Sequence, residues 1–146
     1  MKIKKHHTQR AAECAVEAEL NRRGISTAKT EGSEPGIDLV AILPDGFIPV
    51  EAKGQQGHSD WFISDHGPDA TVFVLVSVPT TDLAKPGAFR FFIMNKTEIA
   101  EAKKAYLQDR RSRGTSDEKW KPAIRWKDGI PHENCWEKLV TRTRPA

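Results

Sequence analysis

Glu51 and Lys53, with Asp38 thirteen positions before Glu51, are the residues whose types and spacing suit chemistry. Glu51 and Lys53 are two positions apart, so on a strand both side chains share one face. Carboxylate oxygens are ligands for hard cations such as Mg²⁺ or Mn²⁺, which lower the pKa of a bound water and neutralise phosphoryl charge. A nearby lysine can hold or deprotonate that water, or stabilise developing charge. These residues therefore predict metal-dependent hydrolysis of a phosphodiester.

A β-hairpin over about residues 37–53 is expected to position these groups. Asp45-Gly46 is a strong signal for a two-residue type I′ turn, and that turn would place Leu39 opposite Ala52. The resulting register makes one face apolar and puts both carboxylates and the lysine on the other. Pro44-Asp45-Gly46 is a competing three-residue turn, which would separate the two carboxylates unless the strand bends.

A helix expected from Thr8, its cap, to Arg23 offers a third carboxylate. Glu13 lies closest to the apolar ridge of this helix on a helical wheel, whereas Glu17 and Glu19 lie farther from it. If the small alanines define the buried face instead, Glu19 becomes the better candidate. The choice between Glu13 and Glu19 stays open at this point.

The rest of the chain predicts a mixed α/β fold, in which a central sheet of about four to five strands is flanked by helices. A continuous apolar run over 71–78 predicts a central strand buried on both faces. The other expected elements are a loop over 28–36, a strand over 88–94, a helix from Asn95 or Thr97 to about Gln108, and a short helix over 132–140.

Composition is that of an ordinary globular chain, with 146 residues, 38% apolar and 29% charged. This length predicts one domain over 1–146. Two cysteines, Cys14 and Cys135, form no disulfide framework, which favours a cytoplasmic location. No secretory h-region follows the first residues, and no apolar run approaches the ~18 residues of a membrane span.

Charge is unevenly distributed along the chain. Residues 1–7 form a basic arm, and residues 101–128 carry nine lysines and arginines against five acids. Residues 109–119 are predicted to form a polar, mobile loop. Arg110 and Arg111 would contact phosphates from this loop, and the alternative is a solvated loop without such contacts. The Trp61-Phe62-Ile63 cluster either packs on the sheet or presents a ring to unstacked bases.

Two segments, Pro35-Gly36-Ile37-Asp38 and Glu51-Ala52-Lys53-Gly54, resemble the motif of the PD-(D/E)xK nuclease superfamily. The motif is an aspartate, a gap, and then (D/E)-x-K. Here two residues separate the proline from Asp38. The spacing of Glu13, Val16, Leu20 and Gly24 resembles the opening helix of the resolvase-like branch. The resemblance covers about residues 10–56.

This resemblance implies a restriction-endonuclease-like fold and a Mg²⁺- or Mn²⁺-dependent endo- or exonuclease that cleaves DNA. Asp38 and Glu51 would bind the metal with help from Glu13, Lys53 would activate or position the nucleophile, and Gln55 would touch the substrate or the metal-bound water. Cutting both strands of a duplex would need two copies, so a homodimer is compatible with the resemblance. The alternatives are a non-catalytic module that binds nucleic acid or protein on the same fold, and a nuclease acting on RNA.

Overall fold

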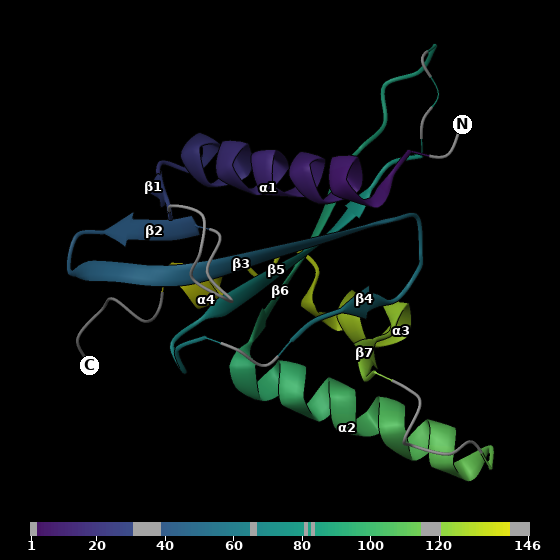
Figure 1. Cartoon of the computed structure of the whole chain (residues 1–146). Coiled ribbons are helices and arrows are strands. Elements are labelled where there is room, and N and C mark those ends of the chain that lie inside the picture. Colours follow the sequence, from purple (N-terminus) through teal and green to yellow (C-terminus); the bar gives the residue numbers. More distant parts are fainter. Residues whose placement is uncertain are drawn as a thin grey trace.

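The computed structural model describes residues 3–30, 39–64, 67–80, 82, 84–114 and 121–140 (Figure 1). Its helical elements are α1 (Lys5–Arg22), α2 (Lys96–Ser112), α3 (Trp126–Gly129), the 3₁₀ turn η2 (Ile130–His132) and α4 (Glu137–Val140). Its strands are β1 (Ser26–Lys29), β2 (Leu39–Leu43), β3 (Gly46–Gln56), β4 (Trp61–Phe62), β5 (Val72–Val78), β6 (Arg90–Asn95) and β7 (Ala123–Ile124).

Five of the strands form a mixed sheet in the order β1-β2-β3-β5-β6. β3 and β5 are parallel, and the other neighbours are antiparallel. β4 and β7 form a separate two-stranded ladder. The expected fold class is confirmed: a mixed central sheet of five strands is flanked by helices. Every residue of β5 is buried, as its continuous apolar run predicts.

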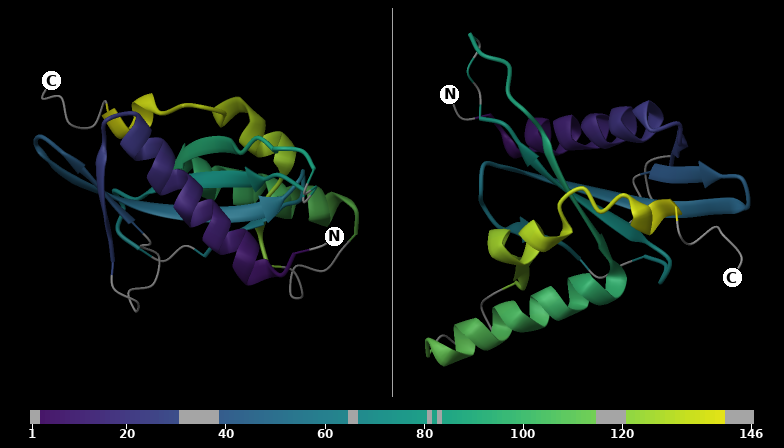
Figure 2. Two further views of the ribbon diagram at one scale, coloured as in Figure 1. Left: turned by 90° about the horizontal axis from the view of Figure 1, so that it is seen from above. Right: turned by 180° about the vertical axis from the view of Figure 1, so that it is seen from behind.

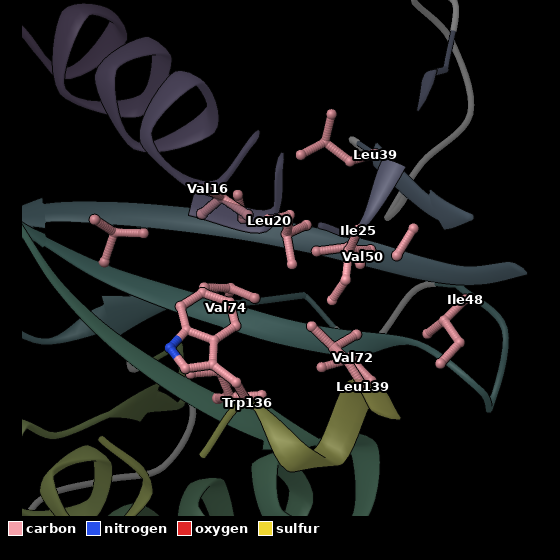
Figure 3. Packing of buried hydrophobic residues seen from close by; sticks show 14 of the residues in the cluster. Val16, Leu20, Ile25, Leu39, Ile48, Val50, Val72, Val74, Trp136 and Leu139 are labelled. Carbon is pink, nitrogen blue, oxygen red and sulfur yellow. The ribbon is translucent and has the colours of Figure 1, made fainter. Parts of the chain in front are cut away.

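Helices cover both faces of the sheet, with α1 above it and α2 below it in Figure 1. On the α1 face, Val16 and Leu20 pack with Val50 and Val74, and Trp136 joins them from the C-terminal segment (Figure 3). On the α2 face, a second apolar cluster gathers around Trp61, Phe73 and Ile99. Strand alternation divides β5 between the two clusters, since neighbouring side chains point to opposite faces.

The C-terminal segment passes from one face of the sheet to the other along β6. The view from behind shows α3, η2 and α4 following one another across the sheet (Figure 2). Glu133 forms a bridge with Phe92, and the backbone N–H of Asn134 donates to the Phe91 carbonyl at 2.9 Å. These contacts cover the outer edge of β6, which would otherwise expose unpaired backbone groups. Of the helix expected over 132–140, only α4 is an α-helix, and residue 132 ends the 3₁₀ turn η2.

The predicted hairpin forms, but both predicted turns are wrong. Leu43 pairs with Gly46 and Leu39 with Val50, so Pro44 and Asp45 make the turn. A turn at Asp45-Gly46 would put Pro44, which has no N–H, in the hydrogen-bonded closing pair. Proline instead takes the first turn position, where its fixed φ is suitable. The register moves by two residues, so the apolar face predicted for the hairpin is preserved.

Helix boundaries also differ from expectation. α1 begins at Lys5, so part of the predicted basic arm over 1–7 is helical. Thr8 is not its cap, because the Thr8 hydroxyl lies 3.5 Å from the Lys4 carbonyl, the contact that a residue inside a helix makes. β1 occupies residues 26–29, and the loop predicted over 28–36 therefore starts too early.

α2 continues through the first part of the loop predicted over 109–119. Asn95 caps the helix in a capping box with Glu98, and the helix ends at Ser112. Gly114 follows with a φ of +74°, the left-handed conformation that commonly ends a helix. Residues 115–119 lie outside the described part of the chain. The described helices are too short or too polar to cross a lipid bilayer.

Candidate active site

Glu51, Lys53 and Gln55 project from one face of β3, as their spacing predicts. Their partners across the parallel pairing are Phe73, Leu75 and Ser77. Phe73 and Leu75 belong to the apolar cluster on the α2 face. The three polar side chains therefore leave β3 on the α2 side, whereas the intervening Ala52 packs under α1.

Glu51 is a buried carboxylate with a lysine close to it. Its exposed fraction is 3%, and its Oε1 lies 3.8 Å from the Lys53 ammonium nitrogen. About one third of the Lys53 side chain remains accessible to solvent. A carboxylate is rarely buried without a partner, since desolvation of its charge is costly. The pair thus brings a negative charge inside the fold and leaves a positive one at the surface.

The edge of β3 that carries this pair has no described strand beside it beyond Val50, where the pairing with β2 ends. Gln9 of α1 takes the place of a strand there. Its side-chain Nε2 donates to the Ala52 carbonyl at 2.8 Å, and its Oε1 accepts from the Gly54 N–H at 3.0 Å. One amide thereby reproduces both hydrogen bonds of a neighbouring peptide.

Gln9 is a site residue that the sequence reasoning missed. A glutamine in the first turns of a polar helix carries no signal of its own, and its role follows from tertiary packing. The only available hint is that Gln9 precedes Glu13 by four residues, which places both side chains on the same side of a helix. Its Nε2 also lies 3.2 Å from Glu13 Oε1.

We expect Gln9→Ala to lower the free energy of unfolding by about 1–3 kcal/mol, because the Ala52 carbonyl and the Gly54 N–H lose their partner. Urea unfolding followed by circular dichroism measures this change. Gln108→Ala, at an exposed position of α2, is the matched control and should change the same free energy by less than about 0.5 kcal/mol. Equal effects of the two substitutions would contradict the role given to Gln9.

The structure places the two candidate glutamates of α1 in different surroundings. Glu13 is held next to β3 through Gln9 and lies 3.6 Å from Arg10. Glu19 is bound by Arg22 at 2.6 Å and by Arg23 at 3.0 Å, and the hydrogen bond from Arg22 lowers the pKa of its carboxyl group. Of the two, Glu13 is the one linked to β3, through Gln9 and the Ala52 carbonyl.

Gln55 follows the pair on the same face and is itself buried. Its Nε2 donates to the Gly57 carbonyl at 2.8 Å, and its Oε1 accepts from the Ser59 N–H at 3.1 Å. Both ends of the amide thus hold the turn after β3. The side chain nevertheless borders the pocket beside Lys53.

A pocket of about 430 Å³ opens beside Lys53, between the first turns of α1 and the segment from β3 to β4. Lys5 and Gln9 line it from α1. Asp60 and Phe62 line it from the β4 side. The pocket leads from solvent to the accessible end of Lys53, so a substrate could reach this ammonium group.

Arg110 and Arg111 are expected on one loop over 109–119, but both lie on α2 and border two different pockets. Arg110 lines a pocket of about 360 Å³ together with Arg113, Arg125 and Lys127, and its guanidinium lies 5.2 Å from the centre of the Tyr106 ring. Arg111 lines a separate pocket formed along α2. Neighbours in a helix project about 100° apart, which accounts for this separation.

The pocket of Arg110 adjoins that of Lys53, because Asp60 borders both. Asp109 lies 3.4 Å from both Arg113 and Arg125, and Asp128 lies 2.7 Å from Arg125. Four cationic side chains and two acidic ones line this second pocket, so cations are in excess. A positive surface therefore continues from the candidate site towards the end of α2.

Asp38, the remaining candidate ligand, lies outside the described residues. Leu39, the next residue in the sequence, is described and pairs with Val50, the residue before Glu51. Within the described ranges, no group of three or more His, Cys, Asp or Glu side chains is placed to hold a metal ion. The buried Glu51 carboxylate still fits a hard cation as one oxygen ligand.

Comparison with solved structures finds a protein with a similar fold. The chain is similar to a bacterial homing endonuclease, I-Ssp6803I, with a TM-score of 0.56 and 13% sequence identity, over 95% of this chain and 94% of that one. The chain has a nuclease-like fold. Neither the models of known protein families nor the curated proteins match its sequence. The similarity therefore concerns the fold.

Proposed function

We propose that this protein is a Mg²⁺- or Mn²⁺-dependent nuclease that hydrolyses phosphodiester bonds of DNA with a PD-(D/E)xK site. The observation that carries the proposal is the buried Glu51 carboxylate, which lies 3.8 Å from the Lys53 ammonium group on a central strand. The nuclease-like fold supports it, as does the pocket that reaches Lys53.

Each residue has a separate role in this proposal. Asp38 and Glu51 hold the divalent cation, and Glu13 assists from α1. When bound, the cation lowers the pKa of a water and neutralises charge on the phosphoryl group. Lys53 orients the attacking water and donates to the oxygen on which negative charge develops. Glu51 in turn keeps the lysine side chain directed along β3, since their charges attract each other.

Cleavage of a panel of DNA substrates by the purified wild-type protein tests the proposal. Single strands, duplexes, nicked duplexes and four-way junctions are incubated with Mg²⁺, with Mn²⁺ or with a chelator. We expect cleavage of at least one substrate that the chelator abolishes. No cleavage of any substrate, together with no Mn²⁺ binding by calorimetry, would contradict the proposed nuclease function. RNA oligonucleotides in the same panel show whether the activity is restricted to DNA.

A duplex substrate requires two cuts, so we infer that two copies of the chain act together on it. One site, built around Lys53, serves one strand at a time. Analytical ultracentrifugation of the protein with and without a duplex in Ca²⁺ measures how many copies bind, and two copies per duplex are expected. A one-to-one complex that still cuts both strands would contradict this inference.

We further propose that Arg110 contacts a substrate phosphate away from the scissile bond. Arg110→Ala should then weaken DNA binding uniformly across sequences and reduce the slope of log K against log salt concentration by about 1. Fluorescence anisotropy over a series of salt concentrations measures that slope. Arg22→Ala is the control, because Arg22 lies at the far end of α1 and is bound to Glu19. An unchanged slope for Arg110→Ala would remove this residue from the binding surface.

A further inference from the structure

Phe62 combines high exposure with a place at the mouth of the candidate site. Its exposed fraction is 61%, and it lines the same pocket as Lys53. Scattered exposed aromatic rings are common on protein surfaces, so exposure alone identifies nothing. The position of Phe62 is informative, because its ring borders the pocket through which a substrate reaches Lys53.

The backbone that carries Phe62 is held firmly. Trp61 and Ile63, its neighbours in the chain, are buried, and Phe62 pairs with Ala123 in the ladder of β4 and β7. The Trp61 indole N–H donates to the Val76 carbonyl at 3.0 Å. Strand alternation then turns Phe62 away from the core. The ring is thus presented to solvent by an anchored strand rather than by a free loop.

The pocket pairs this ring with positive charge. Lys5 and Lys53 line it together with Phe62, and Asp60 is the acidic residue among its lining. A flat apolar ring suits the face of a nucleobase, and ammonium groups suit the adjoining phosphates. A base inside a duplex offers no free face, so it has to leave the stack before such a ring can contact it.

We propose that Phe62 stacks on an unstacked base of the substrate next to the phosphate held at Lys53. This inference rests on the proposed nuclease function and narrows its substrate class. The preferred substrate then contains unpaired nucleotides at the cleavage site, as a single strand, a flap or a junction does. Every base has a π-face, so the contact tolerates any sequence.

Binding to a short single-stranded oligonucleotide without divalent metal tests the proposal, with fluorescence anisotropy as the readout. Base–aromatic stacking predicts that Phe62→Ala raises Kd about 5- to 150-fold, whereas Phe62→Trp keeps it near the wild-type value. Phe47→Ala is the matched control. Phe47 is 70% exposed but lies at the hairpin turn, away from this pocket, so its substitution should leave Kd unchanged.

A second series replaces each base of the oligonucleotide in turn with an abasic site. If Phe62 stacks on one base, a single abasic position should weaken wild-type binding and remove most of the difference between wild type and Phe62→Ala. Unchanged binding by Phe62→Ala, equal losses in the Phe62 and Phe47 variants, or a Phe62 effect that no abasic position reduces would each overturn the proposal. A wild-type protein that cleaves DNA while giving one of these results would retain the nuclease function and lose only the stacking role.

Discussion

Glu51→Gln is expected to abolish both metal binding and cleavage, whereas Lys53→Ala is expected to abolish cleavage alone. The glutamine keeps the volume of the buried side chain but loses the negative charge that holds a cation. The alanine removes the group that orients the water and stabilises developing charge, which is worth about 10²–10⁴-fold in rate. Single-turnover cleavage measures the rate, and Mn²⁺ calorimetry measures binding.

Glu17→Gln provides the control for these two variants. Glu17 lies on α1, is partly accessible and sits 3.5 Å from Lys29, so neither readout should change. Circular dichroism shows whether each variant is folded. Wild-type cleavage by Glu51→Gln, or a loss of Mn²⁺ binding in Lys53→Ala as large as in Glu51→Gln, would contradict the roles assigned to the two side chains.

Much of the fold follows from local patterns in the sequence. The apolar run over 71–78 predicts a doubly buried strand, and β5 is one. Leu39 and Ala41 on β2, and Val50 and Ala52 on β3, are two positions apart, and all four are buried in the same cluster. These predictions succeed because burial on a strand depends on a period of two residues, which survives an error of two in the register.

The predictions that are wrong concern the hairpin turn and the end of α2, where local sequence signals compete. Asp45-Gly46 favours one turn, but the missing N–H of Pro44 favours another, and the structure follows the proline. The polar composition of residues 109–119 predicts a loop. Asp109 and Arg113 instead pair at 3.4 Å across one helical turn, and Gly114 rather than Gln108 marks the helix end.

The sequence predicts the chemical groups of the candidate site, but it does not predict which residues of α1 and β4 lie beside them. Glu51 and Lys53 share a face because they are two residues apart, which any strand guarantees. Gln9 and Phe62 belong to the same pocket only because α1 and β4 pack beside β3. Such contacts join residues more than forty positions apart in the case of Gln9 and Gly54, and no spacing in the sequence encodes them.

Gly54 shows how closely α1 approaches the strand that carries the site. A Cβ placed on Gly54 would lie 2.6 Å from the Ala12 Cβ and 3.0 Å from the Thr8 carbonyl oxygen. Neither neighbour is the end of a flexible side chain, so the helix has to move to relieve the overlap. We expect Gly54→Ala to lower the free energy of unfolding by about 1–3 kcal/mol, the usual cost of overpacking, as measured by urea unfolding.

A double-mutant cycle with Ala12→Gly tests whether this contact causes the loss. Removing the Ala12 methyl group costs about 1 kcal/mol of helix propensity, but it also frees space for the new methyl group. Gly54→Ala should therefore cost less in the Ala12→Gly background than in the wild type. Ala18→Gly, at an exposed position of the same helix, has the same cost in helix propensity but frees no space beside Gly54. Gly54→Ala should therefore keep its full cost in the Ala18→Gly background.

Equal costs of Gly54→Ala in all three backgrounds, within the ~0.5 kcal/mol expected of independent sites, would show that the close approach of α1 is not what requires a glycine. If the cycle instead shows the expected coupling, cleavage gives a second consequence. Displacing α1 also displaces Gln9 from the Ala52 carbonyl and the Gly54 N–H, on either side of Lys53. Because small misplacements of a reacting group can cost about 10²-fold in rate, Gly54→Ala should slow cleavage even where the protein remains fully folded, and Ala12→Gly should restore part of that rate.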